Sequence, residues 1–233
     1  MFARRRKIFE FFGSDRYSHL ALNNLDRKLA KYLNYKCGTF IEVGANDGLS
    51  QSNTYWFERF RNWHGILIEP VPEKAEECKK NRPLAHVFCN ALVSSDRTTS
   101  VTIRTANLMA YVGGSFKDAA AESTHLSDAI RVQDLTSVTD IEVPARTLAS
   151  IIEECGLTSI DLFSLDVEGY ELEVLQGLMV ERHRPRYILV ETREIAAVLD
   201  VLQQYYMVVD KLSHHDYLLK WQLEEQSGHS RPG

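Results

Sequence analysis

Cysteine is scarce in this sequence of 233 residues, and the four cysteines lie far apart. Cys37, Cys78, Cys89 and Cys155 include no Cys-x-x-Cys pair. The spacing therefore indicates neither a zinc site nor a disulfide framework. We expect four buried, reduced thiols.

Long apolar runs are also missing from the sequence. No stretch approaches the ~20 apolar residues that a membrane-spanning helix needs, and the N-terminal residues lack the apolar segment of a secretory signal peptide. There is no internal repeat and no low-complexity tract. We therefore expect a cytoplasmic protein without integral membrane association.

An excess of positive charge is the third absence. The formal net charge is −5 and the isoelectric point is near 5.9, so nucleic acid is a poor candidate partner. The local exception is the basic segment Arg4 to Lys7, which Ile8, Phe9, Phe11 and Phe12 follow. This tail could touch an anionic membrane surface, but we favour a solvated, frayed terminus.

The composition, 44% hydrophobic and 25% charged, fits one globular α/β domain. We expect a basic tail and a packing or lid helix over residues 1–37. Leucines at three- and four-residue spacings predict that helix over about 15 to 35: Leu22, Leu25, Leu29 and Leu33. The remaining residues, 38–233, form the domain, with an insertion near 94–145 where periodicity weakens. Part of this insertion, about 107–139, contains Gly113 and Gly114 and could be a mobile lid.

Apolar strands alternate with amphipathic helices along residues 38–233. Strands are expected near 39–43, 66–69, 85–89, 160–165 and 187–190, followed by two late strands near 207–212 and 217–221. Helices are expected between them. The pattern predicts an α/β fold with a mostly parallel sheet covered on both faces, and the two late strands are expected to form an antiparallel pair at its end.

A glycine-rich turn follows the first strand of that sheet. Residues 39–48 have the sequence TFIEVGANDG, in which Glu42 stands two residues before Gly44 and a second glycine, Gly48, follows. Glycine lets the backbone bend sharply off a buried strand and leaves room for a ligand against the main chain. This pattern is typical of a cofactor-binding turn.

The second strand, within residues 65–70 (GILIEP), ends in a carboxylate, Glu69, placed to accept hydrogen bonds from a ribose diol. An adenosine-containing cofactor is therefore expected. A dinucleotide fold would have Gly-x-Gly-x-x-Gly, but Asn46 stands at its middle glycine. The absence of a phosphate cradle favours S-adenosylmethionine, with its cationic amino acid tail, over NAD.

Four sequence blocks in this order resemble the FkbM family of S-adenosylmethionine-dependent methyltransferases. They are FIEVGANDG with SNT after it, GILIEP, Asn90-Ala91-Leu92, and IDLFSLDVEGYE at 160–171. Each block alone is weak, but four in order, spanning about 38 to 192, are specific. The resemblance implies a Rossmann-like class I methyltransferase fold with a seven-stranded sheet, and transfer of a methyl group to a hydroxyl oxygen of a small metabolite such as a sugar or polyketide.

The resemblance also implies the roles of individual residues. The methionine portion of the cofactor would lie near Glu42, Gly44, Asn46 and Gly48, with Ser52 and Asn53 in the same block. Glu69 would bind the ribose, Asn90 and Ala91 would lie beside the adenine, and Asp166 would lie near the amino acid tail or the acceptor.

Three residues are candidates for the chemistry itself: Asp166, Glu168 and His215. Asp166 follows a buried strand, as does Glu191, and the two carboxylates could together hold a divalent cation. We favour the metal-free alternative, because acids at strand ends often cap the next helix. Two other functions remain open: a non-catalytic module that binds S-adenosylmethionine, and a nicotinamide-dependent oxidoreductase.

Overall fold

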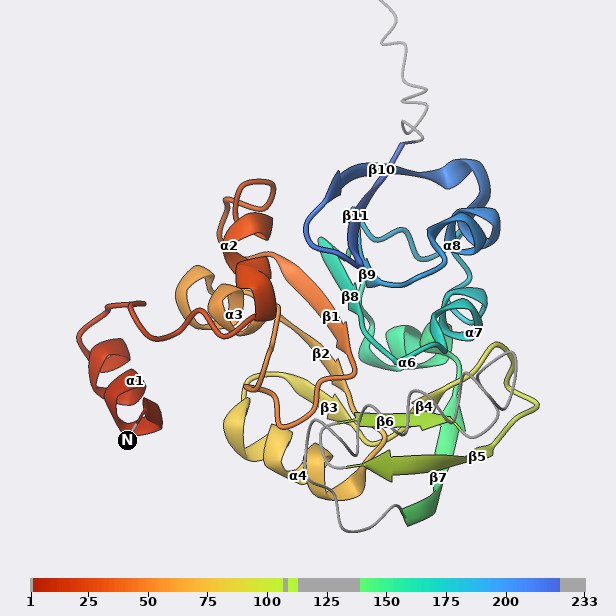
Figure 1. Ribbon diagram of the computed structural model, residues 1–233, viewed down its shortest axis with the longest axis horizontal. Coiled ribbons are helices and arrows are strands. Elements are labelled where there is room, and N and C mark those ends of the chain that lie inside the picture. The colour runs from red at the N-terminus through yellow and green to blue at the C-terminus, as the bar shows by residue number, and fades with distance from the viewer. Residues whose placement is uncertain (1, 107–108, 113–138, 223–233) are drawn as a thin grey trace, which may run out of the picture.

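The computed structural model describes residues 2–106, 109–112 and 139–222. At its centre lies a seven-stranded sheet in the order β10-β11-β9-β8-β1-β2-β3 (Figure 1). The strands are β1 (Thr39–Val43), β2 (His64–Ile68), β3 (His86–Phe88), β8 (Leu162–Leu165), β9 (Tyr187–Glu191), β10 (Tyr206–Lys211) and β11 (Asp216–Trp221). Only β11 runs antiparallel to both of its neighbours, β9 and β10. The predicted seven-stranded, mostly parallel sheet with a late antiparallel pair is confirmed.

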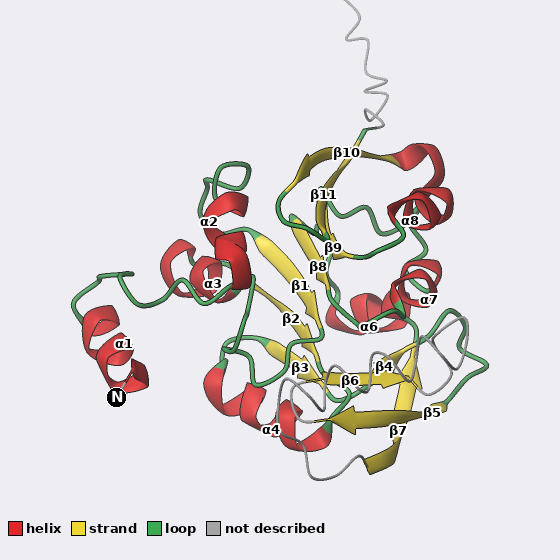
Figure 2. Cartoon of the chain, in the orientation of Figure 1, coloured by secondary structure: helices red, strands yellow, loops and turns green. Residues whose placement is uncertain are grey.

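Helices cover both faces of this sheet (Figure 2). On one face lie α2 (Leu25–Leu29), α3 (Tyr55–Arg61) and α4 (Pro72–Asn81), which share a core with residues such as Phe40 and Leu67. On the other lie α6 (Leu148–Cys155), α7 (Glu171–Gln176) and α8 (Ile195–Leu202), packed against Ile41 and Phe163. Because neighbouring side chains of a strand point to opposite faces, a strand covered on both sides is buried at every position and is mostly apolar. All five residues of β1 are buried accordingly.

A second sheet has the order β4-β7-β5-β6. Its strands are β4 (Ala91–Leu92), β5 (Ser100–Ala106), β6 (Met109–Val112) and β7 (Thr139–Arg146). Three of these strands lie within the segment for which we expected an insertion. Most of the hypothetical lid, including Gly113 and Gly114, lies outside the described residues.

The continuous helix predicted over about 15 to 35 is wrong. The structure has α1 (Phe2–Phe11), a 3₁₀ turn η1 (Leu22–Asn24) and the short α2. Asn23 and Asn24 have φ angles of 53° and 55°, and this left-handed conformation interrupts a right-handed helix. The basic N-terminal segment, which we expected to be solvated and partly frayed, forms the helix α1, and most of its described side chains are exposed.

The cysteines and the lengths of the helices also bear on the expectations from the sequence. All four cysteines are free thiols as expected, but Cys37 is exposed and only Cys78 is fully buried. Across the described ranges, every helix is too short or too polar to cross a bilayer.

Candidate cofactor and active site

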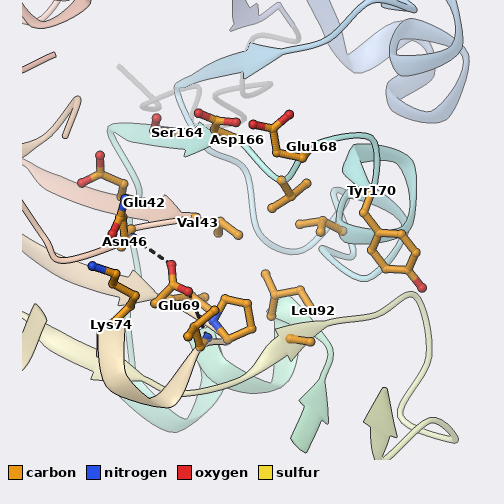
Figure 3. Close-up of a pocket in the computed structure, with 18 of the residues that line it drawn as sticks. Glu42, Val43, Asn46, Glu69, Lys74, Leu92, Ser164, Asp166, Glu168 and Tyr170 are labelled. Atoms are coloured by element: carbon orange, nitrogen blue, oxygen red, sulfur yellow. Dashed lines mark hydrogen bonds between the residues drawn. The ribbon is translucent and has the colours of Figure 1, made fainter. Parts of the chain in front are cut away.

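The candidate site lies where the strand order of the large sheet reverses. From β1 the chain proceeds to β2 and β3 on one side, whereas β8 and β9 occupy the other side of β1. Open α/β sheets bind ligands at this switch point, beyond the carboxyl ends of the strands. A cavity opens there (Figure 3). The predicted site residues that line it are Glu42, Gly44, Asn46, Ser52, Asn53, Glu69, Asn90, Ala91, Asp166 and Glu168.

Gly44 makes the turn that leaves this cavity open. Its φ is +79°, and a Cβ atom built on it would lie 1.9 Å from the carbonyl oxygen of Asp166. Its N–H donates to the carbonyl oxygen of Ile68 at 3.0 Å, so the turn after β1 is held against both flanking strands. A side chain at this position would collide with main chain, which explains the glycine.

Glu69, at the end of β2, holds two loops at the cavity wall. The N–H of Asn46 donates to its Oε2 at 2.8 Å, and the N–H of Val71 donates to its Oε1 at 2.9 Å. Burial raises the pKa of Glu69, and these two donors partly oppose the rise. Each carboxylate oxygen accepts more than one hydrogen bond, so Glu69 retains capacity for ligand hydroxyls.

Glu42 fixes the loop that follows the glycine turn. The hydroxyls of Ser52 and Thr54 donate to its Oε2 at 2.9 and 2.5 Å, and the N–H of Asn53 donates to its Oε1 at 2.7 Å. Charge-assisted bonds of this kind are the stronger class of hydrogen bond. Glu42 therefore fixes the conformation of residues 52–54, the SNT block, and also lines the cavity.

Arg82, which sequence reasoning missed, completes the support of this loop. Its side chain is 0% exposed. It donates to Glu58 Oε1 at 2.9 Å, to the carbonyl oxygen of Gly48 at 3.0 Å and to Thr54 Oγ1 at 3.1 Å. It also lies 3.8 Å from a carboxylate oxygen of Glu42. A single basic residue just after a helix gave no signal, because such residues commonly interact with a helix C-terminus.

Two buried amide oxygens at the cavity have no partner among the described residues: Asn46 Oδ1 and Asn53 Oδ1. The amide nitrogen of Asn53 donates to Ser164 Oγ at 3.1 Å, which leaves its oxygen as an acceptor. Unpaired buried polar atoms are costly and unusual in native structures. Together with Glu42 and Glu69 they make this wall of the cavity rich in acceptors, which suits a ligand that presents hydroxyls or a cation.

Positive charge is sparse at the cavity. Among its described lining residues, Lys74 is the only lysine or arginine, and its ammonium pairs with Glu77 at 3.0 Å. The opposite wall includes Leu92 and Tyr170, seen across the cavity from Glu42 in Figure 3. Ile103, from β5, also lines it. This wall offers apolar area for a flat ring, and sequence patterns had not placed Ile103 or Tyr170 there.

A cluster of acids lies at the ends of β8 and β9. The carboxyls of Asp166 and Glu191 are close enough to interact directly, and the carboxyls of Glu168 and Asp216 are close enough to act on this pair. Burial, and then the charges of Glu191 and Glu168, raise the pKa of Asp166 well above its usual range. A direct interaction between two buried carboxyls is favourable only when one of them carries a proton. The described residues contain no group of three potential ligands arranged to hold a metal ion.

Two predicted site residues do not line the cavity. Gly48 has a φ of +79° and faces Arg82 and Cys78, where a Cβ would lie 2.9 Å from a side-chain atom of each. Gly48 therefore lies on the side of its loop that faces α4, away from the cavity. His215 is exposed between β10 and β11 and is not among the residues that line the cavity.

The sequence is similar to known methyltransferases. Residues 42–219 match the model of the methyltransferase FkbM domain. The 2-O-methyltransferase NoeI of Sinorhizobium fredii is 26% identical over 202 residues, which cover 78% of each chain. A crystal structure of methyltransferase FkbM from Methylobacillus flagellatus aligns with a TM-score of 0.49 and 13% identity, over 92% of this chain and 52% of that chain. A TehB-like SAM-dependent methyltransferase from Corynebacterium glutamicum aligns with a TM-score of 0.42 and 10% identity, over 94% of each chain.

Proposed function

Since the chain belongs to the FkbM methyltransferase family, we propose that it uses S-adenosylmethionine to methylate a hydroxyl oxygen of a small metabolite. The class I methyltransferase fold provides the cavity at the switch point. The name of its relative NoeI, a 2-O-methyltransferase, supports oxygen as the acceptor atom. The acceptor is then a hydroxylated small molecule such as a sugar or polyketide.

The observation that most strongly supports this cofactor is the pair of unpaired acceptors, Asn46 Oδ1 and Asn53 Oδ1. An ammonium group donates hydrogen bonds and accepts none, so these oxygens suit the amino acid tail of S-adenosylmethionine. Glu69 would accept from the ribose hydroxyls. Gly44, whose Cβ would collide with the carbonyl oxygen of Asp166, lets the turn after β1 lie close to β8 at the cavity wall. When bound, the cofactor supplies a methyl group on a positively charged sulfur.

The adenine ring would lie on the apolar side of the cavity. Ala91 and Leu92 are both 4% exposed and line it, and Asn90 next to them donates from its side chain to the carbonyl oxygen of Pro144 at 3.4 Å. An aromatic ring gains from burial against apolar side chains. This arrangement agrees with the role that the resemblance assigns to Asn90 and Ala91.

Methylation of a hydroxyl also requires removal of its proton. We assign this step to Asp166, whose carboxylate would accept the proton when the oxygen forms its bond to the methyl group. Glu191, whose carboxyl interacts with that of Asp166, would hold it in place, and Glu168 also lines the cavity. The exposed His215 would act at most through Glu191. Metal chemistry is not needed for this scheme.

The two alternative functions fit the cavity less well. A nicotinamide dinucleotide would need donors for its pyrophosphate, whereas this wall presents acceptors, and Lys74, the one lysine or arginine among the described lining residues, is paired with Glu77. A non-catalytic binding module would need no acid pair beside the ligand. The acid pair at Asp166 therefore favours an enzyme.

The proposal is tested by incubating the purified protein with S-adenosylmethionine labelled in its methyl group and a panel of hydroxylated acceptors. We expect label in an acceptor as a methyl ether, with S-adenosylhomocysteine as the second product. Binding of the cofactor without transfer to any acceptor would favour the binding module. Reduction of NAD by an alcohol in the same panel would favour the oxidoreductase.

A further inference from the structure

Helix α1 is attached to the body of the protein by a buried acid. Glu10 is 8% exposed, and its Oε1 accepts hydrogen bonds from Ser18 Oγ and Tyr55 OH, both at 2.7 Å. The guanidinium groups of Arg6 and Arg59 each lie 3.5 Å from this carboxylate, and Arg6 also stacks 4.9 Å from the centre of the Tyr55 ring. The inner face of α1 is therefore fixed against α3, at the edge of the molecule (Figure 1).

The outer face of the same helix is apolar and basic. Phe11 is 83% exposed, Phe12 is 78% exposed and Ile8 is 49% exposed. Arg4 and Lys7 join these three residues around one shallow surface hollow. At 3.6 residues per turn, the three apolar residues form a stripe opposite Glu10, with cations along and beside it. We call these five residues the α1 face.

The charge of the α1 face selects its partner. No described carboxylate lies on it, because Glu10, the one acid in α1, is turned inward. A second copy docked face to face would bring the same cations together, which is unfavourable. An anionic lipid surface instead offers negative headgroups to the cations and an apolar layer beneath them to the phenylalanines. The whole chain has a net charge of −5, so this local basic face is distinctive.

We propose that α1 docks the protein on anionic membrane surfaces. Phe11, Phe12 and Ile8 enter the boundary between headgroups and acyl chains, while Arg4 and Lys7 contact headgroup phosphates. The exposed Arg5, on the same helix, adds a third cation. Since the ion pairs of Glu10 hold α1 in the free protein, the helix is already ordered before it binds, which reduces the entropic cost of docking.

The test is co-sedimentation of the full chain with lipid vesicles. We expect binding to vesicles that contain phosphatidylglycerol, little binding to pure phosphatidylcholine, and weaker binding as salt is added. The double variant Phe11→Ser, Phe12→Ser should lose at least about 10-fold in affinity, because each buried methylene contributes measurably to lipid partitioning. Removal of Arg4 and Lys7 by R4S and K7S should cost about 5-fold for each cation.

Matched variants outside α1 distinguish binding through the α1 face from non-specific adsorption to vesicles. Leu84 is 76% exposed and Lys31 is exposed, both outside α1, so Leu84→Ser and Lys31→Ser should bind vesicles like the wild type. Circular dichroism checks that the phenylalanine variant remains folded, as expected for side chains that face solvent. Equal binding to both kinds of vesicle, binding to neither, or unchanged binding by the α1 variants would overturn the proposal. Light scattering measures the oligomeric state and tests the remaining alternative. If the wild type were a dimer and the phenylalanine variant a monomer, a second copy of the chain would cover the α1 face, and the proposal would be overturned.

Discussion

The main chain of Gly44 lies directly against the carbonyl oxygen of Asp166, so that a Cβ on Gly44 would be 1.9 Å from it. These residues end β1 and β8, the two adjacent strands between which the strand order reverses. One contact therefore joins the proposed cofactor turn to the proposed proton acceptor. It couples the shape of the cavity to the position of the acid.

Replacement of Gly44 with alanine should disrupt this contact. Left-handed φ angles cost a non-glycine residue about 1 to 3 kcal/mol, and the collision with main chain adds to that. We expect cofactor affinity, measured by calorimetry, to fall below detection. Gly156 is the matched control, because its φ is +61° but a Cβ there would meet nothing within 4 Å. If Gly156→Ala weakened cofactor binding as much as Gly44→Ala does, the effect would come from backbone strain in general and not from the contact with Asp166.

Arg82→Met should destabilise the protein by about 3 to 5 kcal/mol, because it leaves the carboxylates of Glu42 and Glu58 buried without their cation. Arg82→Lys should recover only part of this, since one ammonium cannot replace a planar fork with several donors. Urea denaturation measures both. Arg97 is exposed, so Arg97→Met is the control and should be neutral. A stability change below ~1 kcal/mol for Arg82→Met would refute the supporting role of this residue.

Asp166→Asn should lower turnover by at least about 100-fold, the usual contribution of a general base. Because this change removes one member of an acid cluster, the free energy of unfolding should not fall. The raised pKa of Asp166 predicts that wild-type turnover increases with pH through the range in which the pair with Glu191 loses its proton. The metal-free scheme also predicts that EDTA leaves the turnover of the wild type unchanged.

Loss of activity in EDTA and recovery with magnesium would support the metal alternative, and near-normal turnover in Asp166→Asn would refute both. Asp200→Asn, at an exposed acid on α8, is the control.

Glu171 predicts a pH dependence of stability. Burial raises its pKa from 4.5 to about 7, although the N–H of Gly169 donates to it at 2.7 Å. The folded state therefore holds this proton more tightly than the unfolded state does. The corresponding stability is fully present below the unfolded pKa and is lost as the pH rises through about 7, a change of about 3 kcal/mol.

The Glu171→Gln variant isolates this effect, because glutamine still offers an oxygen to Gly169. Compared with the wild type, we expect it to be about 3 kcal/mol more stable at pH ~8 and similar at pH ~4. Glu73→Gln, which changes an exposed acid on α4, should follow the wild type at both values. Parallel pH profiles for wild type and Glu171→Gln would contradict the assignment.

Most of the fold could be predicted because its signals are local. The mostly apolar runs that form β1, β2, β8 and β9 lie between helices on both faces of the sheet, and strands in that position need apolar residues at most positions. The N-terminal region was mispredicted for a local reason too. The leucine spacing was that of a helix, but Asn23 and Asn24 adopt left-handed conformations that spacing does not report. Asparagine tolerates this conformation better than most residues.

The candidate site could be predicted only where its residues follow strands. Glu42, Gly44 and Glu69 stand at strand ends, so topology alone brings them together. Arg82 and Ile103 reach the site only through tertiary contacts. Arg82 is 34 residues away in sequence from Gly48, whose carbonyl oxygen it binds, and Ile103 lines the cavity from β5. Gly48 shows the converse, because a motif position that matches a ligand-binding turn instead packs against Arg82.

The most direct test of the account is a calorimetric titration of the wild type and of Glu69→Gln with S-adenosylmethionine. We predict one site per chain in the wild type, and an affinity about 10- to 100-fold lower in Glu69→Gln, because a neutral amide is a weaker acceptor for ribose hydroxyls than a carboxylate. NAD, titrated under the same conditions, should give no binding heat. The account would be contradicted if the folded wild type failed to bind S-adenosylmethionine, or if NAD bound more tightly.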